Sequence, residues 1–295
     1  MPLTRLRRTW LFVPGADAAA HDAAAGSGAD VLIQELEDFT PPELRPKARR
    51  LAAGLYDRWR RAGAIAAVRV NPLESCGRED LAAVMIGRPD IVLMPKVVSP
   101  DQVRALEQAT GGAVELVPNV ETAAGLLNAF QIGKASRKVT AMLVASEDMV
   151  ADLGTNRSRG GEELAYVRAR FLVECRAAGV EAIDCPYTFS DVAGAIRDAK
   201  YAKRLGYRMK SLVATGHASP INKVFSVSEF ELKNARRIVK AFEQARSQGK
   251  GRAKVDGKLV EMPIYSAARR LLQEHARRVG ASILNTPPPQ QKKPR

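Results

Sequence analysis

Short apolar runs recur along the chain and alternate with longer segments of helical character. The centres of these runs are nearly continuous in apolar residues, which is typical of parallel strands covered on both faces. We predict eight strands, at residues 9–15, 30–38, 64–72, 90–96, 114–121, 141–148, 181–187 and 209–215. Most of the segments between them end on glycine, as helix C-termini prefer. The alternation over residues 1–222 predicts an α/β fold, a (β/α)8 TIM barrel.

Polar or special residues gather where the predicted strands end. They are Gly15, Glu35, Glu37, Asp38, Arg69, Asn71, Lys96, Glu121, Glu147, Asp148 and Asp184, with His217 just beyond the last strand. A doubly wound open sheet, the alternative architecture, would place ligand groups in a single crevice. Charged groups at the end of nearly every strand indicate a ring of side chains, and a closed barrel provides one.

Beyond the predicted barrel the pattern changes to long amphipathic segments. Ser226 or Ser228 is placed to cap a long helix, and the Asp-Gly pair that begins at Asp256 predicts a hairpin turn. A last helix precedes a tail, residues 283–295, that lacks apolar content and is predicted to be disordered. We therefore expect residues 223–282 to form a helical extension with a hairpin that packs on a neighbouring subunit.

The net charge limits the choice of partner. The chain has 295 residues, 46% of them hydrophobic, and a formal net charge of +14 at pH 7. Such a charge suits either nucleic acid or acidic small molecules. The basic residues are scattered, and no basic run is interleaved with aromatic residues, which make up only 5% of the chain. We therefore expect no nucleic-acid partner and a preference for acidic metabolites or phosphorylated ligands.

Cysteine count and hydropathy narrow the class of protein further. The three cysteines are an odd number and lack a CxxC pair or a histidine at ligand spacing, so neither a disulfide framework nor a zinc site is predicted. No apolar run approaches the ~20 residues of a membrane span, and the N-terminal one is too short for a signal peptide. We expect a cytoplasmic protein with no membrane partner. His21 and His275 lie on predicted helices and are expected at the surface.

Two carboxylates end consecutive predicted strands, Glu121 on the fifth and Asp148 on the sixth. Neighbouring strand ends meet at the mouth of a barrel, so the two side chains can converge there. Hard oxygen ligands with room for waters and substrate suit Mg²⁺, with Mn²⁺ as an alternative. In the competing interpretation Asp148 caps the following helix, and Glu147 pairs with an arginine or a lysine.

Arg69 lies near the end of the third predicted strand. A guanidinium keeps its charge and binds carboxylates through two parallel hydrogen bonds. Opposite a metal held by two acids, Arg69 would hold the carboxylate of a keto-acid substrate. It can equally balance Glu35, Glu37 or Asp38 from the second strand, and the two roles are compatible.

Eight sequence blocks, taken in order, resemble the citrate lyase β-subunit-like (CitE-like) group of the HpcH/HpaI aldolase superfamily. The blocks are RTWLFVPGAD, LEDFTPPE, VRVNPL, VLMPKV, VETAAGLLN, SEDMVADLG, AIDCPY and NKVFSVSEFELKNARRIVKAF, between about Arg8 and Arg270. The resemblance implies a TIM barrel of the phosphoenolpyruvate/pyruvate type that binds Mg²⁺. It also implies a carbon–carbon lyase that cleaves or forms a bond next to a thioester, as in citryl-, malyl- or citramalyl-CoA.

The resemblance implies roles for particular residues. Glu121 and Asp148 match the family's metal-binding acids. Arg69 matches the arginine that holds the substrate carboxylate. The acidic block that contains Glu37 and Asp38 helps, in this family, to orient metal-bound water and the arginine.

A late motif, DGKLVEMP, matches the segment that supplies an acid–base carboxylate, commonly to the site of a neighbouring subunit. In this chain that carboxylate is Glu261. We therefore expect a homo-oligomer, and the resemblance implies a trimer or a multiple of a trimer. Pro14 and Gly15 end the first predicted strand and, with Glu35 and His217, are expected to contact the substrate.

Three positions depart from the family pattern. Glu35 and Glu261 each stand where the family has an aspartate. In the loop VATGHASPIN, Ala214 and Thr215 replace a His-Pro pair and His217 replaces a glutamine, which leaves open whether CoA is bound. Alternative functions are a free 2-oxo-acid aldolase, a thioester hydrolase, or a ligand-binding homologue without catalysis. His217 is interpreted either as a substrate contact or proton donor, or as a partly exposed loop residue.

Overall fold

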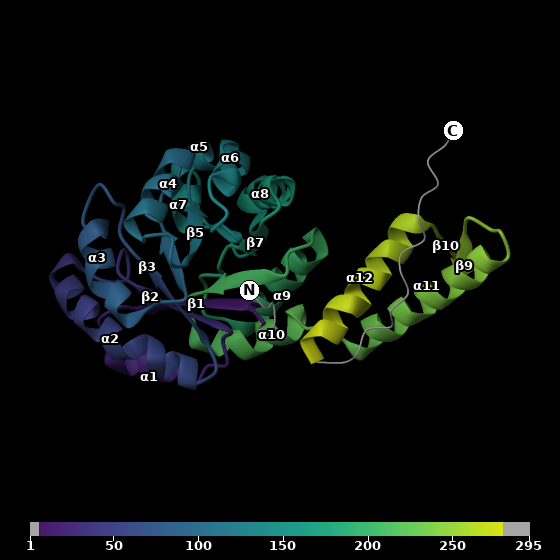
Figure 1. The fold of residues 1–295 in the computed structure, drawn as a ribbon, viewed down its shortest axis with the longest axis horizontal. Coiled ribbons are helices and arrows are strands. Elements are labelled where there is room, and N and C mark those ends of the chain that lie inside the picture. The colour runs from purple at the N-terminus through teal and green to yellow at the C-terminus, as the bar shows by residue number, and fades with distance from the viewer. Residues whose placement is uncertain (1–5, 280–295) are drawn as a thin grey trace. The chain divides into compact units, whose positions relative to one another are not determined.

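The computed structural model describes residues 6–279, and the predicted disordered tail at 283–295 lies outside them. The chain divides into two compact units, one formed by Arg7–Phe225 and the other containing the residues from Ser226 on. Figure 1 shows the first unit as a barrel of strands surrounded by helices, and the second as a pair of long helices with a short hairpin. Each unit has a hydrophobic core of its own.

Eight parallel strands close into a barrel, in which each strand pairs with its neighbours in chain order. The strands are Thr9–Pro14 (β1), Val31–Glu35 (β2), Ile65–Arg69 (β3), Ile91–Met94 (β4), Glu115–Val120 (β5), Ala141–Val144 (β6), Glu181–Asp184 (β7) and Met209–Leu212 (β8). The pairing of β1 with β8, which sets Thr9 beside Lys210, closes the ring. The predicted (β/α)8 barrel is therefore confirmed, and an open doubly wound sheet is excluded.

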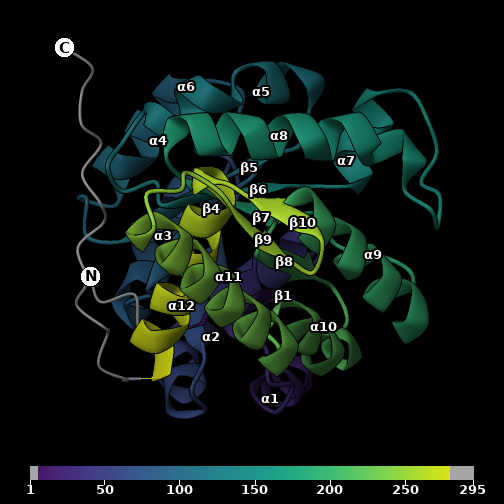
Figure 2. The same ribbon diagram turned by 90° about the vertical axis from the view of Figure 1, so that its right-hand side faces the viewer.

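Helices connect the strands and cover the outside of the barrel. They are Ala18–Ala25 (α1), Arg45–Arg61 (α2), Gly77–Val84 (α3), Pro100–Ala109 (α4), Ala123–Leu127 (α5), Ala129–Lys134 (α6), Glu147–Asp152 (α7), Ala165–Ala178 (α8), Val192–Leu205 (α9) and Ala218–Phe225 (α10). Short 3-10 helices lie at Pro42–Leu44 (η1), Met85–Gly87 (η2), Glu162–Leu164 (η3) and Thr215–His217 (η4). Figure 2 shows α5, α6 and α8 grouped on the side of the barrel formed by β5 and β6.

Alternation along the strands separates an inner core from an outer one. The inner cluster consists of Trp10, Phe12, Val31, Ile33, Ile65, Ala67, Ile91, Leu93, Val117, Ala141, Leu143, Ile183 and Met209. The strand residues between them point outward and pack against the helices in a larger cluster. Both faces of each strand are therefore buried, which explains why the apolar runs are nearly continuous.

The same alternation decides which strand-end side chains face the barrel axis. Polar residues lie two positions beyond an inward-facing apolar residue at Glu35, Arg69 and Asn119. Side chains two residues apart share a face of a strand, so these three extend the inner core toward the carboxyl-terminal mouth. All three are buried, at 6% exposure or less.

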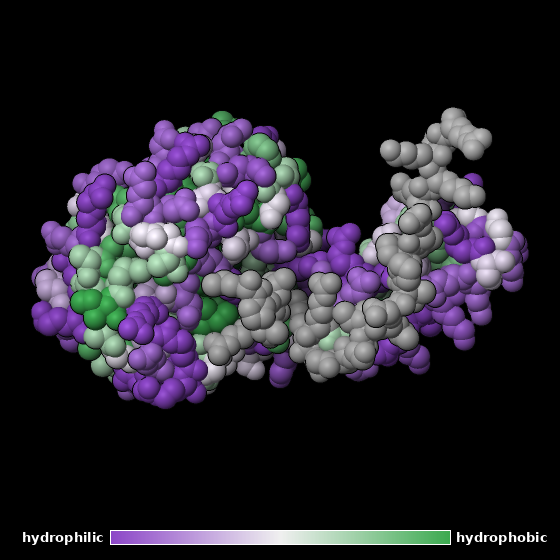
Figure 3. Space-filling model, viewed as in Figure 1, coloured by the Kyte–Doolittle hydropathy of each residue, from purple (hydrophilic) through white to green (hydrophobic). Residues whose placement is uncertain are grey.

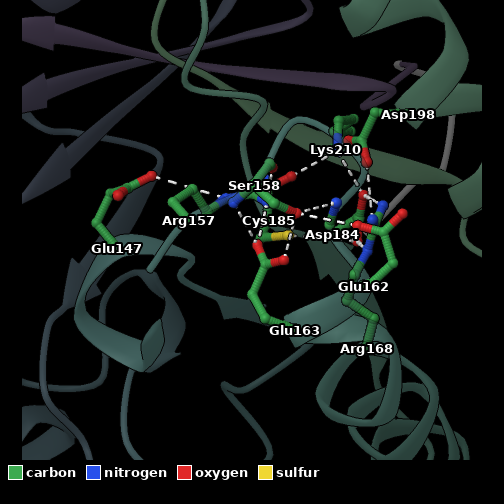
Figure 4. Close-up of polar contacts among 11 residues, drawn as sticks. Glu147, Arg157, Ser158, Glu162, Glu163, Arg168, Asp184, Cys185, Asp198 and Lys210 are labelled. Carbon is green, nitrogen blue, oxygen red and sulfur yellow. Dashed lines mark hydrogen bonds and ion pairs between the residues drawn. The ribbon is translucent and has the colours of Figure 1, made fainter. Parts of the chain in front are cut away.

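A set of buried charges lies outside the barrel, between its last two strands and the helices that cover them. Arg168 on α8 donates to both carboxylate oxygens of Asp184 on β7, at 2.8 and 2.7 Å, and to Asp198 on α9 at 2.8 Å. Lys210 Nζ on β8 lies 2.5 Å from an oxygen of each aspartate. Figure 4 shows the four side chains converging. Two cations and two anions balance there, and together they join two strands to two helices.

The C-terminal unit contains Glu229–Ser247 (α11), a hairpin of Ala253–Val255 (β9) and Lys258–Val260 (β10), and Met262–Val279 (α12). Ser228 begins α11 with a capping box, in which its hydroxyl accepts from the amide of Glu231 and the Glu231 carboxylate accepts in return from the amide of Ser228. The predicted hairpin is present, with Asp256 at a positive φ of 48° in its turn. Phe242 and Tyr265 stack in the small core of this unit, with ring centroids 4.7 Å apart.

Hydrophilic residues cover most of the face of the barrel unit seen in Figure 3, with small hydrophobic patches between them. Ile86 on η2 and Phe39 in the loop after β2 are among the large hydrophobic residues left accessible, at 74% and 40% exposure. Within residues 6–279 no helix combines the length and the apolar character needed to cross a membrane.

Candidate active site

Arg69 lies at the centre of a cluster of acids at the carboxyl-terminal mouth of the barrel. Its Nε is 2.9 Å from Glu35 Oε1, and its Nη2 is 3.2 Å from Glu37 Oε2. Asp38 lies 3.5 Å from Nη2, and Glu121 lies 3.6 Å from Nη1. Burial alone would lower the pKa of Arg69, but the surrounding carboxylates raise it above its ordinary value. Arg69 is therefore a permanent cation, held in one orientation by acids from two strands.

Glu35 fixes both Arg69 and the loop that follows β2. Its Oε1 accepts from Arg69 Nε at 2.9 Å and from the amide of Glu37 at 2.6 Å. Its Oε2 accepts from the amide of Phe39 at 2.5 Å. The longer side chain of a glutamate at this position thus reaches the arginine and two loop amides together. With both oxygens engaged by the protein, Glu35 is placed to orient the site.

Glu37 and Lys96 form a second ion pair beside Arg69. Lys96 Nζ donates to Glu37 Oε1 at 2.7 Å, which raises the pKa of the lysine, and the backbone amide of Lys96 donates to Glu121 Oε2 at 3.1 Å. Burial raises the pKa of Glu37, against the lowering effects of Arg69 and Lys96. Lys96 has a φ of +56°, a left-handed conformation that is uncommon for a residue other than glycine. In the sequence, only the position of Lys96 at a strand end indicates that it belongs to the site. That position does not predict the left-handed backbone conformation.

Glu121 is fully buried directly after β5. Burial raises the pKa of its carboxyl group to about 8; Arg69 lowers it, and the charge of Asp148 raises it further. Asn119 Nδ2 lies 3.4 Å from Glu121 Oε1, and the Asn119 Oδ1 atom is buried without a hydrogen-bond partner. The carboxyl group of Glu121 therefore lies beside the polar side chain of Asn119, and the charge of Asp148 acts on it.

Asp148 and Glu147 occupy the first turn of α7 rather than the end of a strand. The predicted strand at 141–148 is therefore too long, because β6 ends at Val144. Ser146 is the N-cap residue of α7 and no side chain caps this helix, so the interpretation of Asp148 as a helix cap is wrong. Among the described residues, none forms a hydrogen bond or an ion pair with the half-buried Asp148 side chain.

Glu147, by contrast, points to a neighbouring loop. Its Oε1 accepts from Thr188 Oγ1 at 2.7 Å and lies 3.8 Å from Arg157 Nε. Arg157 also donates to Glu163 at 2.6 Å, and Figure 4 shows Arg157 between the two acids. The predicted pairing of Glu147 with an arginine is present. It leaves Asp148 as the acid of the Glu147–Asp148 pair that is free to take a ligand.

The charge and donor chemistry of the mouth fit a divalent cation. The acids are Glu35, Glu37, Asp38, Glu121 and Asp148, and the cations are Arg69 and Lys96. Even with Glu121 protonated, four carboxylates against two cations leave an excess of negative charge that a dication would offset. Within residues 6–279 no three acids, histidines or cysteines gather closely enough to enclose a metal on their own. Two carboxylates with waters and substrate oxygens are the ligand set that Mg²⁺ prefers.

Pro14 and Gly15 lie at the end of β1, and their backbone groups have partners within the protein. The amide of Gly15 donates to Thr40 Oγ1 at 2.9 Å, and its carbonyl accepts from Gln34 Nε2 at 3.0 Å. A Cβ atom at Gly15 would lie 2.4 Å from the carbonyl oxygen of Glu35, so the glycine permits a close approach of β1 and β2. The contact of Pro14 and Gly15 with the substrate stays a prediction.

His217 lies in η4 and is only 1% exposed, so the interpretation as a partly exposed loop residue is wrong. Its Nε2 lies 3.2 Å from the carbonyl oxygen of Ser190, and its ring packs beside Tyr187 with centroids 6.2 Å apart. Its Nδ1 is buried without a hydrogen-bond partner. His217 is thus a packed residue under the loop after β7.

Glu261 belongs to the C-terminal unit, directly before α12. Its side chain is about half exposed and lies 3.8 Å from Arg252 Nε. The structure therefore groups Arg69 with Glu35, Glu37, Asp38 and Glu121, with the charge of Asp148 acting on Glu121. It leaves the proposed partnership of Glu261 with a barrel mouth as a prediction.

Known proteins share this fold and much of this sequence. Citrate lyase subunit beta of Escherichia coli is 34% identical over 283 residues, which cover 91% of this chain and 93% of that protein. A (3S)-malyl-CoA thioesterase of Cereibacter sphaeroides is 33% identical over 274 residues, which cover 90% and 93%. The crystal structure of CitE from Mycobacterium tuberculosis in complex with magnesium, acetoacetate and coenzyme A matches with a TM-score of 0.77 at 25% identity, over 94% of this chain and 100% of that one.

The family is also evident from a family-level comparison. The model of the family described as HpcH/HpaI aldolase/citrate lyase matches residues 8–215, which include β1 to β8 and the acid cluster around Arg69. Together with relatives above 30% identity over nine-tenths of the chain, this match is decisive. The chain therefore belongs to the HpcH/HpaI aldolase/citrate lyase family.

Proposed function

We propose that this protein is a Mg²⁺-dependent carbon–carbon lyase that cleaves a small hydroxy-acid carried as a CoA thioester. The observation that carries the proposal is the position of Arg69 among four carboxylates, with the charge of Asp148 acting on Glu121. Similar structures from Mycobacterium tuberculosis are complexes of magnesium with oxaloacetate, pyruvate or acetoacetate, and one of them also contains coenzyme A. In such a site a guanidinium binds the carboxylate of a keto acid, and a dication polarises its carbonyl oxygen.

Some residues of the mouth bind the substrate or the metal, and others orient the residues that do so. Arg69 holds the carboxylate next to the hydroxyl-bearing carbon of the substrate. Glu35 fixes Arg69, and Glu37 with Asp38 orients water and the guanidinium. Glu121 and Asp148 are the carboxylates that would hold Mg²⁺, and bound Mg²⁺ would supply charge stabilisation to the oxygen of the oxo-acid fragment.

The proposed reaction breaks the bond between the hydroxyl-bearing carbon and the carbon next to the thioester carbonyl. The hydroxyl proton passes to a carboxylate, and the oxygen's electron pair completes the new carbonyl group of the oxo acid. The electrons of the broken bond become the thioester enolate, which takes up a proton and leaves as acetyl-CoA. Glu261 is our candidate for the carboxylate that manages this proton.

The location of Glu261 in a separate unit leads us to propose a homo-oligomer in which it serves a neighbouring copy. Active-site complementation tests this arrangement. Arg69→Lys and Glu261→Gln homo-oligomers should each be nearly inactive, and mixing them under conditions of subunit exchange should restore part of the activity. Mixtures that remain inactive, although mass spectrometry shows exchanged subunits, would contradict the arrangement.

Product analysis tests the reaction itself. Purified protein with Mg²⁺ is incubated separately with malyl-, citramalyl- and citryl-CoA, and oxo acid, acetyl-CoA and free thiol are quantified. A lyase releases oxo acid and acetyl-CoA in equal amounts, without free thiol. Arg69→Lys keeps the positive charge but loses the paired N–H donors of the guanidinium, and it should lower the rate at least about tenfold. Failure to cleave any of the thioesters would contradict the proposal.

A thioester hydrolase is the second candidate, because a relative at 33% identity bears the name (3S)-malyl-CoA thioesterase. Hydrolysis consumes water and yields the free hydroxy acid and CoA thiol, with no oxo acid. The same incubation separates the two activities, since thiol release without oxo acid identifies the hydrolase.

A further inference from the structure

Phe39 is a large aromatic residue left accessible among the charged groups of the barrel mouth. Its exposure is 40%, and it directly follows Asp38, whose carboxylate lies 3.5 Å from Arg69 Nη2. An exposed phenyl ring gains nothing from water, and a neighbouring ring, that of Phe12, covers only part of this one. We propose that Phe39 determines specificity at the site, by favouring an oxo-acid fragment that carries a small alkyl group over one that carries a second carboxylate.

Hydrogen bonds hold the backbone on which the ring is carried. The amide of Phe39 donates to Glu35 Oε2 at 2.5 Å, so the residue is attached to the same carboxylate that orients Arg69. The next residue, Thr40, donates its hydroxyl to the carbonyl of Glu35 at 2.5 Å and accepts from the amide of Gly15 at 2.9 Å. The loop is therefore held at both sides of Phe39.

Aromatic contacts connect Phe39 to the guanidinium. Its ring meets that of Phe12 edge to face, with centroids 6.4 Å apart and an interplanar angle of 71°. Arg69 Cζ lies 4.9 Å from the centroid of the Phe12 ring. Phe12 is 7% exposed and belongs to the inner core, whereas Phe39 is 40% exposed, so the two rings together form an aromatic surface that reaches from the inner core to solvent. A substrate carboxylate bound by Arg69 would bring the adjoining carbon of the substrate to this surface.

The chemistry of that surface distinguishes substituents on the adjoining carbon. A methyl group gains by leaving water for contact with a phenyl ring. A carboxymethyl group would bring a second negative charge to the ring and lose hydration, close to Asp38 and Glu37. The inference rests on the proposed function: the substituent is methyl in citramalyl-CoA, carboxymethyl in citryl-CoA and hydrogen in malyl-CoA.

The test compares kcat/KM for citramalyl-CoA and citryl-CoA in the wild type, Phe39→Ala and Phe39→Leu. The wild type should prefer citramalyl-CoA. Phe39→Ala should lower the ratio of the two constants about tenfold, the low end of what one methylene in an apolar pocket contributes. Phe39→Leu should retain most of the preference. Ile86→Ala, at an accessible apolar residue that precedes β4, should leave the ratio unchanged.

Binding supplies a readout that does not need turnover. Calorimetric titration of pyruvate and freshly prepared oxaloacetate, with Mg²⁺ present, should show the affinity ratio shifting toward oxaloacetate in Phe39→Ala. Equal losses of both affinities, an unchanged kcat/KM ratio, or a change in oligomeric state without a change in ratio would overturn the role of Phe39. A wild type that neither binds an oxo acid nor cleaves any thioester would instead contradict the proposed function, and this inference with it.

Discussion

Glu121 and Asp148 differ in the way each is available to a cation. Glu121 is fully buried and accepts hydrogen bonds from Lys96 and Asn119. Asp148 is half buried at the start of α7, and no described residue forms a hydrogen bond or an ion pair with it. The Glu121 carboxyl group, whose pKa is raised, must lose a proton to bind metal, whereas Asp148 has no hydrogen bond from a described residue to give up. The two acids therefore lead to different predictions.

Replacing Asp148 by asparagine should lower Mg²⁺ affinity at least about tenfold, because one of two charged ligands is lost while the shape is kept. The fold should be unaffected, since the carboxylate has no protein partner among the described residues. Titration calorimetry measures the affinity, and circular dichroism follows the unfolding. Glu147→Gln is the matched control. Wild-type Mg²⁺ affinity in Asp148→Asn would show that Asp148 is not a ligand.

The raised pKa of Glu121 makes Mg²⁺ binding depend on pH. Burial places this pKa at about 8, above its ordinary value of 4.5, so at neutral pH the metal-free carboxyl group holds a proton that the cation must displace. Mg²⁺ affinity should rise with pH until about pH 8 and then level off. The metal-free protein should lose stability over the same interval, because the folded state binds the extra proton. Calorimetry in buffers of different ionisation enthalpy should detect the released proton, and Glu121→Gln should release none.

The sequence predicts the neighbours of a residue correctly where that residue lies at the end of a strand, because the strand ends of a barrel meet at its mouth. Arg69, Glu35 and Glu37 all lie at the ends of predicted strands, and the structure brings them together. Histidines are harder, because burial depends on what packs over a helix or loop. His21, expected at the surface, is fully buried, with Nε2 2.9 Å from the carbonyl oxygen of Pro14 and its ring edge-on to Trp59.

At the scale of elements, the eight strands are found because parallel strands buried on both faces leave unbroken apolar runs. Their ends are predicted less well. The predicted strand 30–38 ends at Glu35 in the structure, and 141–148 ends at Val144. The extra residues belong to the loop after β2 and to the first turn of α7. In that loop, the amides of Glu37 and Phe39 donate to the side chain of Glu35 at the strand end. A linear apolar pattern does not contain that information.

The cap of α11 gives a prediction at this scale. Ser228→Ala removes a hydroxyl that accepts from the amide of Glu231, and should destabilise the helix by about 1 kcal/mol. Hydrogen exchange should accelerate in the first turns of α11. Oxo-acid binding measured on the same sample should be unchanged. Ser247→Ala, at the last residue of the helix, is the matched control, and equal effects of the two changes would contradict the role of the cap.

At the scale of the whole barrel, the network of Arg168, Asp184, Asp198 and Lys210 is the feature that the sequence does not predict. Its members come from two strands and two helices and are separated by up to 42 residues. The sequence shows only Asp184 at a strand end, which suggests a site residue. The structure instead directs this side chain outward, next to the inward-facing Ile183, into contact with Arg168 on α8 and Lys210 on β8. Charge balance, rather than ligand binding, accounts for its burial.

Lys210→Met tests whether this network holds the end of the barrel together. The change removes a fully buried cation and leaves Asp184 and Asp198 facing Arg168 alone, so one negative charge is uncompensated. The free energy of unfolding should fall by about 3–5 kcal/mol, as it does when one partner of a buried ion pair is removed. Urea denaturation measures it. Lys200→Met, at an exposed position on α9, should lower it by less than about 0.5 kcal/mol. If the two variants unfold at the same urea concentration, the network does not stabilise the barrel, and the closure of β7 and β8 depends on their apolar faces.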